Sequence, residues 1–375
     1  MLSDITEAIG GHICIGISGL SLTEDEKKFI LNNNISGVTL FARNVKDPRQ
    51  VFELTQELHQ LSHQMKSKAP FIVAIDMEGG RVARLKNPFT EWPALKAYGD
   101  LDSPTVSFLA YQSLGLELAA VGINVDFAPC LDIFTNPQNQ IIGDRSVGSD
   151  PELVAKHGSA LIRGLLKAGV LPCIKHFPGH GHTLIDSHED LPIEEADLER
   201  LRNTEMIPFK KAFKSKANFV MTAHIRFKNI DPDWPVTLSE KFLKNILRDE
   251  LRFNGMVITD DLDMKAMAKH YAKDFIPVRA LQAGADMLLY CNEPESQQIA
   301  VEAIKKAVSD GKLSAAHLEA TYKRNLEFRV HHVKDYAGLS WEKSQKMVGH
   351  ADHKALSEAV KKGSVPANLI QKLQE

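Results

Sequence analysis

The sequence predicts a (β/α)₈ barrel, the TIM-barrel fold, in a single domain with a short helical appendage at its C-terminal end. Three observations lead to this prediction: eight short apolar runs, helical patterns between most of them, and polar residues directly after most of the runs. Runs of this length and composition are typical of strands that are buried on both faces. They cover residues 12–17, 37–41, 71–75, 124–127, 171–174, 219–222, 256–259 and 287–290.

Segments with apolar residues at helical spacing lie between most of these runs, as Val51, Leu54, Leu58 and Leu61 show within residues 48–66. Alternation of strands and helices indicates parallel βαβ units. A doubly wound sheet is the alternative, but the turn GISGLSLTEDE after the first run is a poor match to the glycine-rich phosphate turn of that fold. The other expected helices cover residues 103–120, 151–167, 196–214, 239–253 and 295–310.

The pattern changes after about residue 337. Residues 340–375 are rich in lysine and contain two helical patches, at 354–362 and 367–374. A segment of this size is too small to bury a core of its own. We therefore expect a barrel domain over residues 1–338 and an appendage, residues 339–375, that packs on it.

Composition excludes several classes of function. Hydrophobic residues make up 43% of the 375 residues, enough for a large core, and the net charge of −3 arises from acids and bases mixed along the chain. This gives no electrostatic reason to expect nucleic acid or a membrane as a partner. No apolar stretch reaches the roughly 18 residues of a membrane-spanning helix, and the first residues lack a secretory pattern. We expect a cytoplasmic protein, monomeric or weakly dimeric, with buried reduced thiols at Cys14, Cys130, Cys173 and Cys291.

Polar residues follow six of the runs, at the ends where a barrel carries its chemistry. A single acid after a strand often only caps the next helix. Six strands with such ends favour acid–base or carboxylate chemistry on a ligand rich in hydroxyl groups, and no nucleophilic serine or cysteine stands out. The residues are Arg43, Asn44, Asp76, Glu78, Asp126, Asp132, Lys175, His176, His224, Asp260 and Asp261.

The segment KHFPGHGHTLIDSH, residues 175–188, contains four histidines after the fifth run. His176, His180, His182 and His188 could supply imidazoles to a metal, so a metal-dependent barrel hydrolase is an alternative class. Against it, no H-x-H pair follows the first run, and a proline and a glycine keep two of the histidines off one helix face. We expect neither a metal nor another cofactor.

Eight motifs stand in order along the chain. They are GVTLFARN (37–44), AIDMEGGRVARL (74–85), GINVDFAPCLDI (122–133), IIGDRSVGSDP (141–151), KHFPGHG (175–181), DSH (186–188), VMTAHI (220–225) and VITDDLDMKAM (257–267). Together they resemble the family 3 glycoside hydrolases, specifically the bacterial β-N-acetylglucosaminidases of cell-wall recycling. The resemblance covers about residues 13–328.

The resemblance implies a retaining hydrolase in which Asp260 is the nucleophile and His188, paired with Asp186, is the acid/base. A carboxylate nucleophile forms a covalent glycosyl-enzyme intermediate. A carboxylate two residues from His188 can accept one ring N–H, orient the imidazole and raise its pKa. The residues that the resemblance implies for holding the sugar hydroxyls are Asp76, Arg84, Arg145, Lys175 and His176.

Other polar residues near the strand ends have structural interpretations. We interpret Asp261 and Asp263 as caps of the following helix, and Glu78 and Arg81 as a brace for the adjacent double-glycine turn. His224 is expected to line the site.

The segment after the fifth strand is expected to move as a loop. His180 is assigned to the structure of this loop. Without ligand, we expect His188 to lie well beyond the separation of about 5 Å that is typical of a retaining pair.

The expected reaction is exo-cleavage of terminal β-linked N-acetylglucosamine from peptidoglycan fragments (muropeptides), such as GlcNAc-1,6-anhydroMurNAc with or without peptide. Alternatives within the family are a β-glucosidase or β-xylosidase and a GlcNAc phosphorylase. A catalytically silent sugar-binding barrel is a further alternative of another class. Some relatives continue into a second α/β domain that residues 339–375 do not provide, so we expect the loops of the barrel to complete the site.

Overall fold

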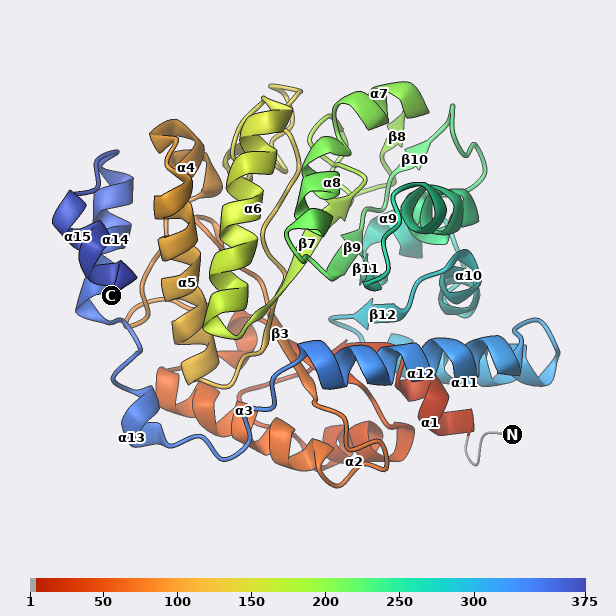
Figure 1. Ribbon diagram of the computed structural model, residues 1–375. Helices are drawn as coiled ribbons and strands as arrows, with labels where there is room; N and C mark the ends of the chain where they lie inside the picture. Colours follow the sequence, from red (N-terminus) through yellow and green to blue (C-terminus); the bar gives the residue numbers. More distant parts are fainter. Residues whose placement is uncertain (1–4) are drawn as a thin grey trace.

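The computed structural model describes residues 5–375 and contains the closed barrel of parallel strands that the sequence predicts (Figure 1). The strands lie in the order β1-β12-β11-β9-β7-β6-β3-β2, so the first and last strands of the barrel pair with each other. Each of the eight predicted runs forms one of these strands, which confirms the fold class. Their bounds are β1 (Ile13–Gly16), β2 (Gly37–Leu40), β3 (Ile72–Ile75), β6 (Val125–Asp126), β7 (Leu171–Phe177), β9 (Phe219–Thr222), β11 (Met256–Asp261) and β12 (Met287–Tyr290).

Helices cover the outside of the barrel (Figure 1). Three of the predicted helices begin alike: Asp47, Ser103 and Asp150 each accept a hydrogen bond from the backbone N–H three residues later, and a proline opens the helix. These caps fix where the helices start. Two short helices of this layer are α1 (Ile5–Gly10) and α4 (Leu95–Leu101). The longer ones are α2 (Glu24–Asn33), α3 (Pro48–Ser62), α5 (Pro104–Ala120), α6 (Pro151–Ala168), α10 (Phe275–Ala283), α11 (Pro294–Ser309) and α12 (Ala315–His332).

Two predicted helices take a different form. The helix expected over residues 196–214 is divided into α7 (Leu198–Asn203) and α8 (Ile207–Lys214). Pro208 lacks the N–H that a continuous helix would need at this point. The helix expected over residues 239–253 winds as the π-helix η4 (Lys241–Glu250).

Two apolar layers stabilise the barrel. One fills its interior and includes Phe127 and Met221, and the other lies between the strands and the surrounding helices. Phe328 of α12 closes the N-terminal end of the barrel, where its ring packs on Phe219 at a centroid distance of 5.7 Å. The opposite end, where the strands terminate, is therefore the one left open for chemistry.

The segment at residues 339–375 packs against the barrel layer. It consists of α13 (Trp341–Ser344), α14 (Ala351–Lys361) and α15 (Ala367–Gln374), and Figure 1 shows α14 and α15 beside α4 and α5. His353 Nδ1 lies 2.9 Å from the buried carboxylate of Glu117 on α5, and Leu356 is fully buried. The Trp341 ring packs on Phe52 of α3.

Short elements complete the loops at the open end. β4 (Met77–Gly79) pairs antiparallel with β5 (Val82–Ala83), and β8 (Ile193–Glu194) pairs with β10 (Arg226–Phe227). The remaining elements are η1 (Ala42–Asn44), η2 (Gly143–Arg145), η3 (Val236–Leu238) and α9 (Lys265–Ala268).

The structure can be compared with two expectations drawn from the sequence, that the thiols are buried and reduced and that no helix spans a membrane. Cys14, Cys130, Cys173 and Cys291 are buried and free, as predicted. Burial raises the pKa of the Cys14 thiol to about 12, so this side chain stays protonated. Within residues 5–375, none of the helices combines the length and apolar character needed to cross a bilayer.

Candidate active site

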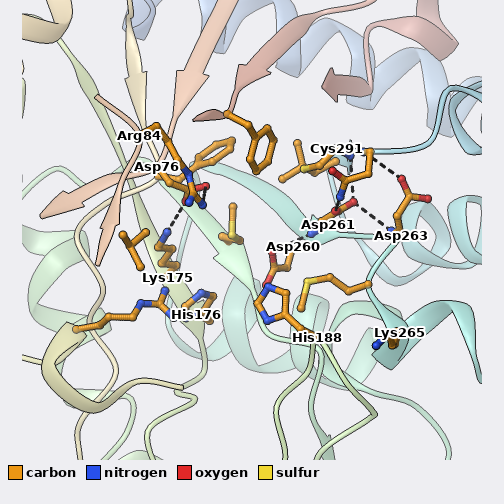
Figure 2. A pocket seen from close by; sticks show the side chains of 18 residues that line it. Asp76, Arg84, Lys175, His176, His188, Asp260, Asp261, Asp263, Lys265 and Cys291 are labelled. Carbon is orange, nitrogen blue, oxygen red and sulfur yellow. Dashed lines mark hydrogen bonds and ion pairs between the residues drawn. The ribbon is translucent and has the colours of Figure 1, made fainter. Parts of the chain in front are cut away.

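A pocket of about 430 Å³ opens at the C-terminal ends of the barrel strands (Figure 2). It brings together seven of the eight residues that the sequence singles out as site residues. Asp186 is the exception, because it lies behind His188 and binds the ring of that residue. The seven are Asp76, Arg84, Arg145, Lys175, His176, His188 and Asp260.

Three cations and two carboxylates form a network in this pocket. Lys175 Nζ lies 2.7 Å from Asp76 Oδ1 and 2.6 Å from Glu78 Oε1. Arg145 donates two hydrogen bonds to Glu78, of 2.9 and 2.8 Å, and Arg84 Nη2 lies 3.2 Å from Asp76 Oδ2. The network presents charge-assisted donors and the Asp76 carboxylate to the pocket in fixed positions, an arrangement that can bind the hydroxyl groups of a sugar, whereas Glu78 does not line the pocket.

Ion pairing keeps these groups charged although they are buried. Burial alone would raise the pKa of Asp76, but Lys175 and Arg84 reverse this effect and hold the pKa well below its usual range. For Glu78, Arg145 and Lys175 likewise outweigh burial and lower the pKa to about 2. Burial would lower the pKa of Lys175, and the two carboxylates raise it instead. Both acids therefore act as anions at neutral pH.

The interpretation of Glu78 as a brace for the double-glycine turn is wrong. Its side chain is only 1% exposed and pairs with Lys175 and Arg145. Arg81 binds Asp144 and the carbonyl oxygens of the loop that carries Arg145. A signal for Glu78 was available, because side chains two residues apart in an extended chain point the same way, and Asp76 is two residues before it.

Asp260 lies at the end of β11 and faces the pocket. Its Oδ1 accepts a hydrogen bond of 2.8 Å from the Asp261 N–H. Burial would raise the pKa of Asp260, but the positive charges that His224 and His176 can carry lower it below its usual value. The carboxylate is therefore ionised at neutral pH, as a nucleophile requires.

The interpretation of His224 as a pocket-lining residue is wrong, because its side chain is fully buried and is not part of the pocket wall. Its Nδ1 lies 2.7 Å from Thr237 Oγ1, and its Nε2 lies 3.0 Å from the Asp261 carbonyl oxygen. His224 thus holds the backbone of the strand end beside Asp260.

Asp261 and Asp263 stay structural, but their partners differ from the expected helix cap. Asp261 Oδ1 accepts from the backbone N–H groups of Asp263 and Cys291, both at 3.1 Å. Asp263 Oδ2 accepts from the N–H of Glu293, at 3.2 Å, where α11 begins. The two carboxylates therefore join the end of β11 to the loop after β12, rather than capping α9.

Asp186 and His188 form a hydrogen-bonded dyad. Asp186 Oδ1 lies 2.8 Å from both the backbone nitrogen and the ring Nδ1 of His188. Figure 2 shows the imidazole of His188 pointing toward Asp260, and the side chains of His188 and Asp260 line the same pocket. The expectation that the loop moves and that His188 lies beyond about 5 Å from Asp260 without ligand stays a prediction. Asp186 orients the ring and leaves the other ring nitrogen for the pocket.

His176 also lines the pocket, and its Nδ1 lies 2.6 Å from Asp132 Oδ2. The other polar residues of the wall are Asp261, Asp263, Lys265 and Asn292. Cys130, Asp132 and His176 are also close enough together to be considered as metal ligands. However, the Cys130 thiol donates to Asp132, and burial raises the pKa of Cys130 well above its usual value. Asp132 also accepts from the backbone N–H groups of His176 and His180, so hydrogen bonds hold this trio together in the structure.

The histidines that could have formed a metal site have separate partners. His180 binds Thr183 and Ser187, and His182 binds Thr135. His176 and His188 each pair with their own aspartate. The four imidazoles therefore make hydrogen bonds to different partners, although the rings of His176 and His180 lie 5.8 Å apart between centroids.

Comparison with known protein families matches residues 8–328 to the glycosyl hydrolase family 3 N-terminal domain. The chain belongs to this family. It is therefore a glycosidase, as the motifs predict. Curated relatives named "Beta-hexosaminidase" include a protein of Nitrosomonas eutropha, 35% identical over 292 residues, which are 76% of this chain and 82% of the relative. A second relative with this name, from Actinobacillus pleuropneumoniae serotype 3, is 37% identical over 291 residues, which are 76% of this chain and 81% of the relative.

Solved structures of the family share the fold. A family 3 β-N-acetylglucosaminidase from Paenibacillus sp. str. FPU-7 matches with a TM-score of 0.88 and 35% identity, over 96% of this chain and 69% of that one. NagZ from Neisseria gonorrhoeae, in complex with N-trifluoroacetyl-D-glucosamine, matches with a TM-score of 0.75 and 30% identity, over 95% and 98%. A fungal multi-domain family 3 β-N-acetylglucosaminidase matches with a TM-score of 0.91 and 32% identity, and this chain spans 43% of its length.

Proposed function

We propose that this family 3 glycosidase is a retaining exo-β-N-acetylglucosaminidase. The observation that carries the proposal is the placement of Asp260 and the His188–Asp186 dyad at one pocket, beside a charged network that can bind sugar hydroxyls. The names of the relatives support the sugar: they are β-hexosaminidases, and the Neisseria structure contains an N-acylated glucosamine.

In the first chemical step, an Asp260 oxygen attacks the anomeric carbon while the bond from that carbon to the leaving oxygen breaks. His188 gives its proton to the leaving oxygen, so the aglycone departs as a neutral alcohol. Asp186 accepts the other ring N–H and stabilises the imidazole while it is charged. The product of this step is an ester between Asp260 and the sugar.

In the second step, water attacks the same carbon from the face that the aglycone has left. His188 accepts a proton from this water, and the ester bond to Asp260 breaks. The Asp260 carboxylate is a good leaving group because its pKa is lowered. Two inversions at one carbon give a product with the original β configuration.

The network of Asp76, Lys175, Arg84 and Arg145, together with His176, would hold the sugar. The Asp76 carboxylate accepts from hydroxyl groups, and the cations donate to them. Asp132 fixes His176 through a 2.6 Å hydrogen bond and leaves the opposite ring nitrogen for the ligand. These groups define a site for one terminal sugar, which agrees with exo-cleavage.

For the natural substrate we propose peptidoglycan fragments that carry a terminal β-linked N-acetylglucosamine on an anhydro-N-acetylmuramic acid, with or without peptide, degraded in the cytoplasm. The proposal rests on the sequence motifs that resemble enzymes of cell-wall recycling. Loss of purified disaccharide–peptide, followed by mass spectrometry, tests it directly.

Hydrolysis of a chromogenic N-acetylglucosaminide tests the activity. We expect wild type to turn it over and Asp260→Asn to lose roughly 1,000-fold or more in kcat, the scale on which removal of one catalytic side chain acts in other enzymes. A 2-fluoro sugar should label the peptide that contains Asp260. A label elsewhere, or a product of inverted configuration, would refute the mechanism.

The same assay separates the alternatives. A faster reaction with the glucoside than with the N-acetylglucosaminide would indicate a β-glucosidase. A rate that depends on added phosphate would indicate a phosphorylase. Inhibition by a strong chelator would indicate a metal-dependent hydrolase.

A further inference from the structure

His180 is a buried, titratable side chain to which the mechanism above gives no role. It is 2% exposed and does not line the pocket. Its backbone is fixed to the loop after β6, because its N–H donates to Asp132 Oδ1 at 2.7 Å and its carbonyl accepts from Asn139 Nδ2 at 2.8 Å. These bonds hold the backbone of His180 in place within the loop that carries the dyad.

Both ring nitrogens of His180 have partners in the same loop. Nδ1 lies 2.7 Å from Thr183 Oγ1, and Nε2 lies 3.2 Å from Ser187 Oγ. Burial lowers the pKa of His180 to about 4, so the ring is neutral at neutral pH. A neutral imidazole offers one donor and one acceptor, which the two hydroxyl groups can satisfy together.

Ser187 is the residue between Asp186 and His188. Its side chain is buried, and its carbonyl oxygen accepts a hydrogen bond of 3.1 Å from the Ala266 N–H of α9. Ser187 is thus held by His180 on its hydroxyl and by α9 on its backbone. Because peptide bonds join it directly to both members of the dyad, fixing Ser187 restricts where Asp186 and His188 can lie.

We propose that His180 is a positioning residue that holds His188 over Asp260 through its hydrogen bond to Ser187, without contacting the substrate. The inference rests on the proposed function, in which His188 is the acid/base. His180 connects Asp132, a fully buried residue of the loop after β6, with the exposed catalytic imidazole. The exposed side chain of His188 makes such a support necessary, since packing alone does not hold it.

Leaving-group dependence distinguishes positioning from a purely structural role. A dinitrophenyl leaving group departs without protonation, whereas a phenyl leaving group needs the acid. We expect His188→Ala to reduce kcat/KM on phenyl β-N-acetylglucosaminide by about 100-fold or more and to affect the dinitrophenyl substrate little. We expect His180→Ala to show the same selectivity on a smaller scale, about 10-fold on the phenyl substrate.

Four further variants sharpen the test. Ser187→Ala removes the other end of the same hydrogen bond, so it should reproduce the selectivity, and the double variant should add little to either single one. His180→Gln keeps an amide that can bond Ser187 and should recover part of the loss. His182→Ala is the matched control, because His182 lies in the same loop but binds Thr135 and not Ser187. It should leave the selectivity at the wild-type value.

Each outcome decides one question. Equal losses on both substrates in His180→Ala and Ser187→Ala, or no loss in either, would overturn the positioning role. A selective loss in His182→Ala as large as in His180→Ala would overturn it as well. If His188→Ala itself shows no selectivity, the acid/base assignment fails, and with it the proposed mechanism. Thermal denaturation of every variant identifies any that does not fold, in which case Ser187→Ala carries the test.

Discussion

Glu78 is nearly inaccessible to solvent, yet two cations of the pocket depend on its charge. The positions of Asp76 and Lys175 in the pocket follow from a simple rule, that residues after parallel strands meet at one end of a barrel. Arg145 lies in η2, well after the end of β6, and was expected only from the family resemblance. The pairing among them does not follow from this rule. Several acids stand after the strands, and the sequence alone does not say which cation each will meet.

Replacement of Glu78 tests the energetic weight of this network. We expect Glu78→Gln to lower the free energy of unfolding by about 3 kcal/mol, because it leaves the buried Arg145 without its countercharge and leaves Lys175 with Asp76 alone. Glu53→Gln is the control: its partner Arg49 is exposed, and such pairs contribute less than about 1 kcal/mol. Urea denaturation measures both. Similar small losses in the two variants would contradict the expectation.

The depressed pKa of Glu78 gives a pH dependence with a definite sign. Its ordinary pKa is 4.5, and in the folded protein it is about 2. Stability from such a group is complete above the ordinary pKa and is lost as pH falls through the folded pKa. We expect a loss of roughly 3 kcal/mol over this range, since one pKa unit corresponds to about 1.4 kcal/mol. Urea titrations at several pH values should show the difference between wild type and Glu78→Gln shrinking toward acid.

At the scale of elements, helices with a one-sided apolar face and a side-chain cap were predictable, as α3 and α6 illustrate. α12 was missed because its buried face mixes apolar and polar residues. Tyr322 and Phe328 are buried there together with Thr321, Asn325 and Arg329. Such a helix has no clean apolar stripe, and only its contacts with the end of the barrel explain its burial.

The appendage gives a prediction about α14. Leu356 is fully buried at its contact with the barrel layer, so Leu356→Ala should cost about 2–5 kcal/mol in local stability. Because α14 lies away from the pocket, kcat should not change. Hydrogen exchange should rise in residues 351–374 before it rises in the strands. Loss of activity in parallel with this exchange would show that the appendage shapes the site.

At the scale of the whole molecule, packing and catalysis occupy opposite ends of the barrel. Phe328 closes one end against Phe219, and the charged pocket occupies the other. The alternation of eight apolar runs with helical segments was sufficient to predict the barrel itself. They could not predict which segment would close it, because that depends on a contact between residues more than one hundred positions apart.

Removal of the closing ring tests this separation. We expect Phe328→Ala to lower the free energy of unfolding by about 3–5 kcal/mol, the usual cost of such a cavity. The kcat of the folded enzyme should stay within about twofold of wild type, since the cavity lies at the far end from Asp260. Measurement of kcat well below the unfolding temperature separates the two effects. A large fall in kcat at that temperature would show that the two ends are coupled.

The pairing of β1 with β12 has a consequence for synthesis of the chain. β1 is the first strand to be synthesised. Its partner β12 is synthesised only after about three quarters of the polypeptide. Until then a nascent barrel has open edges, and unpaired strand edges favour association with other chains. Ribosome stalling before Met287 should therefore yield aggregation-prone intermediates that recruit chaperones, whereas stalling beyond α12 should not.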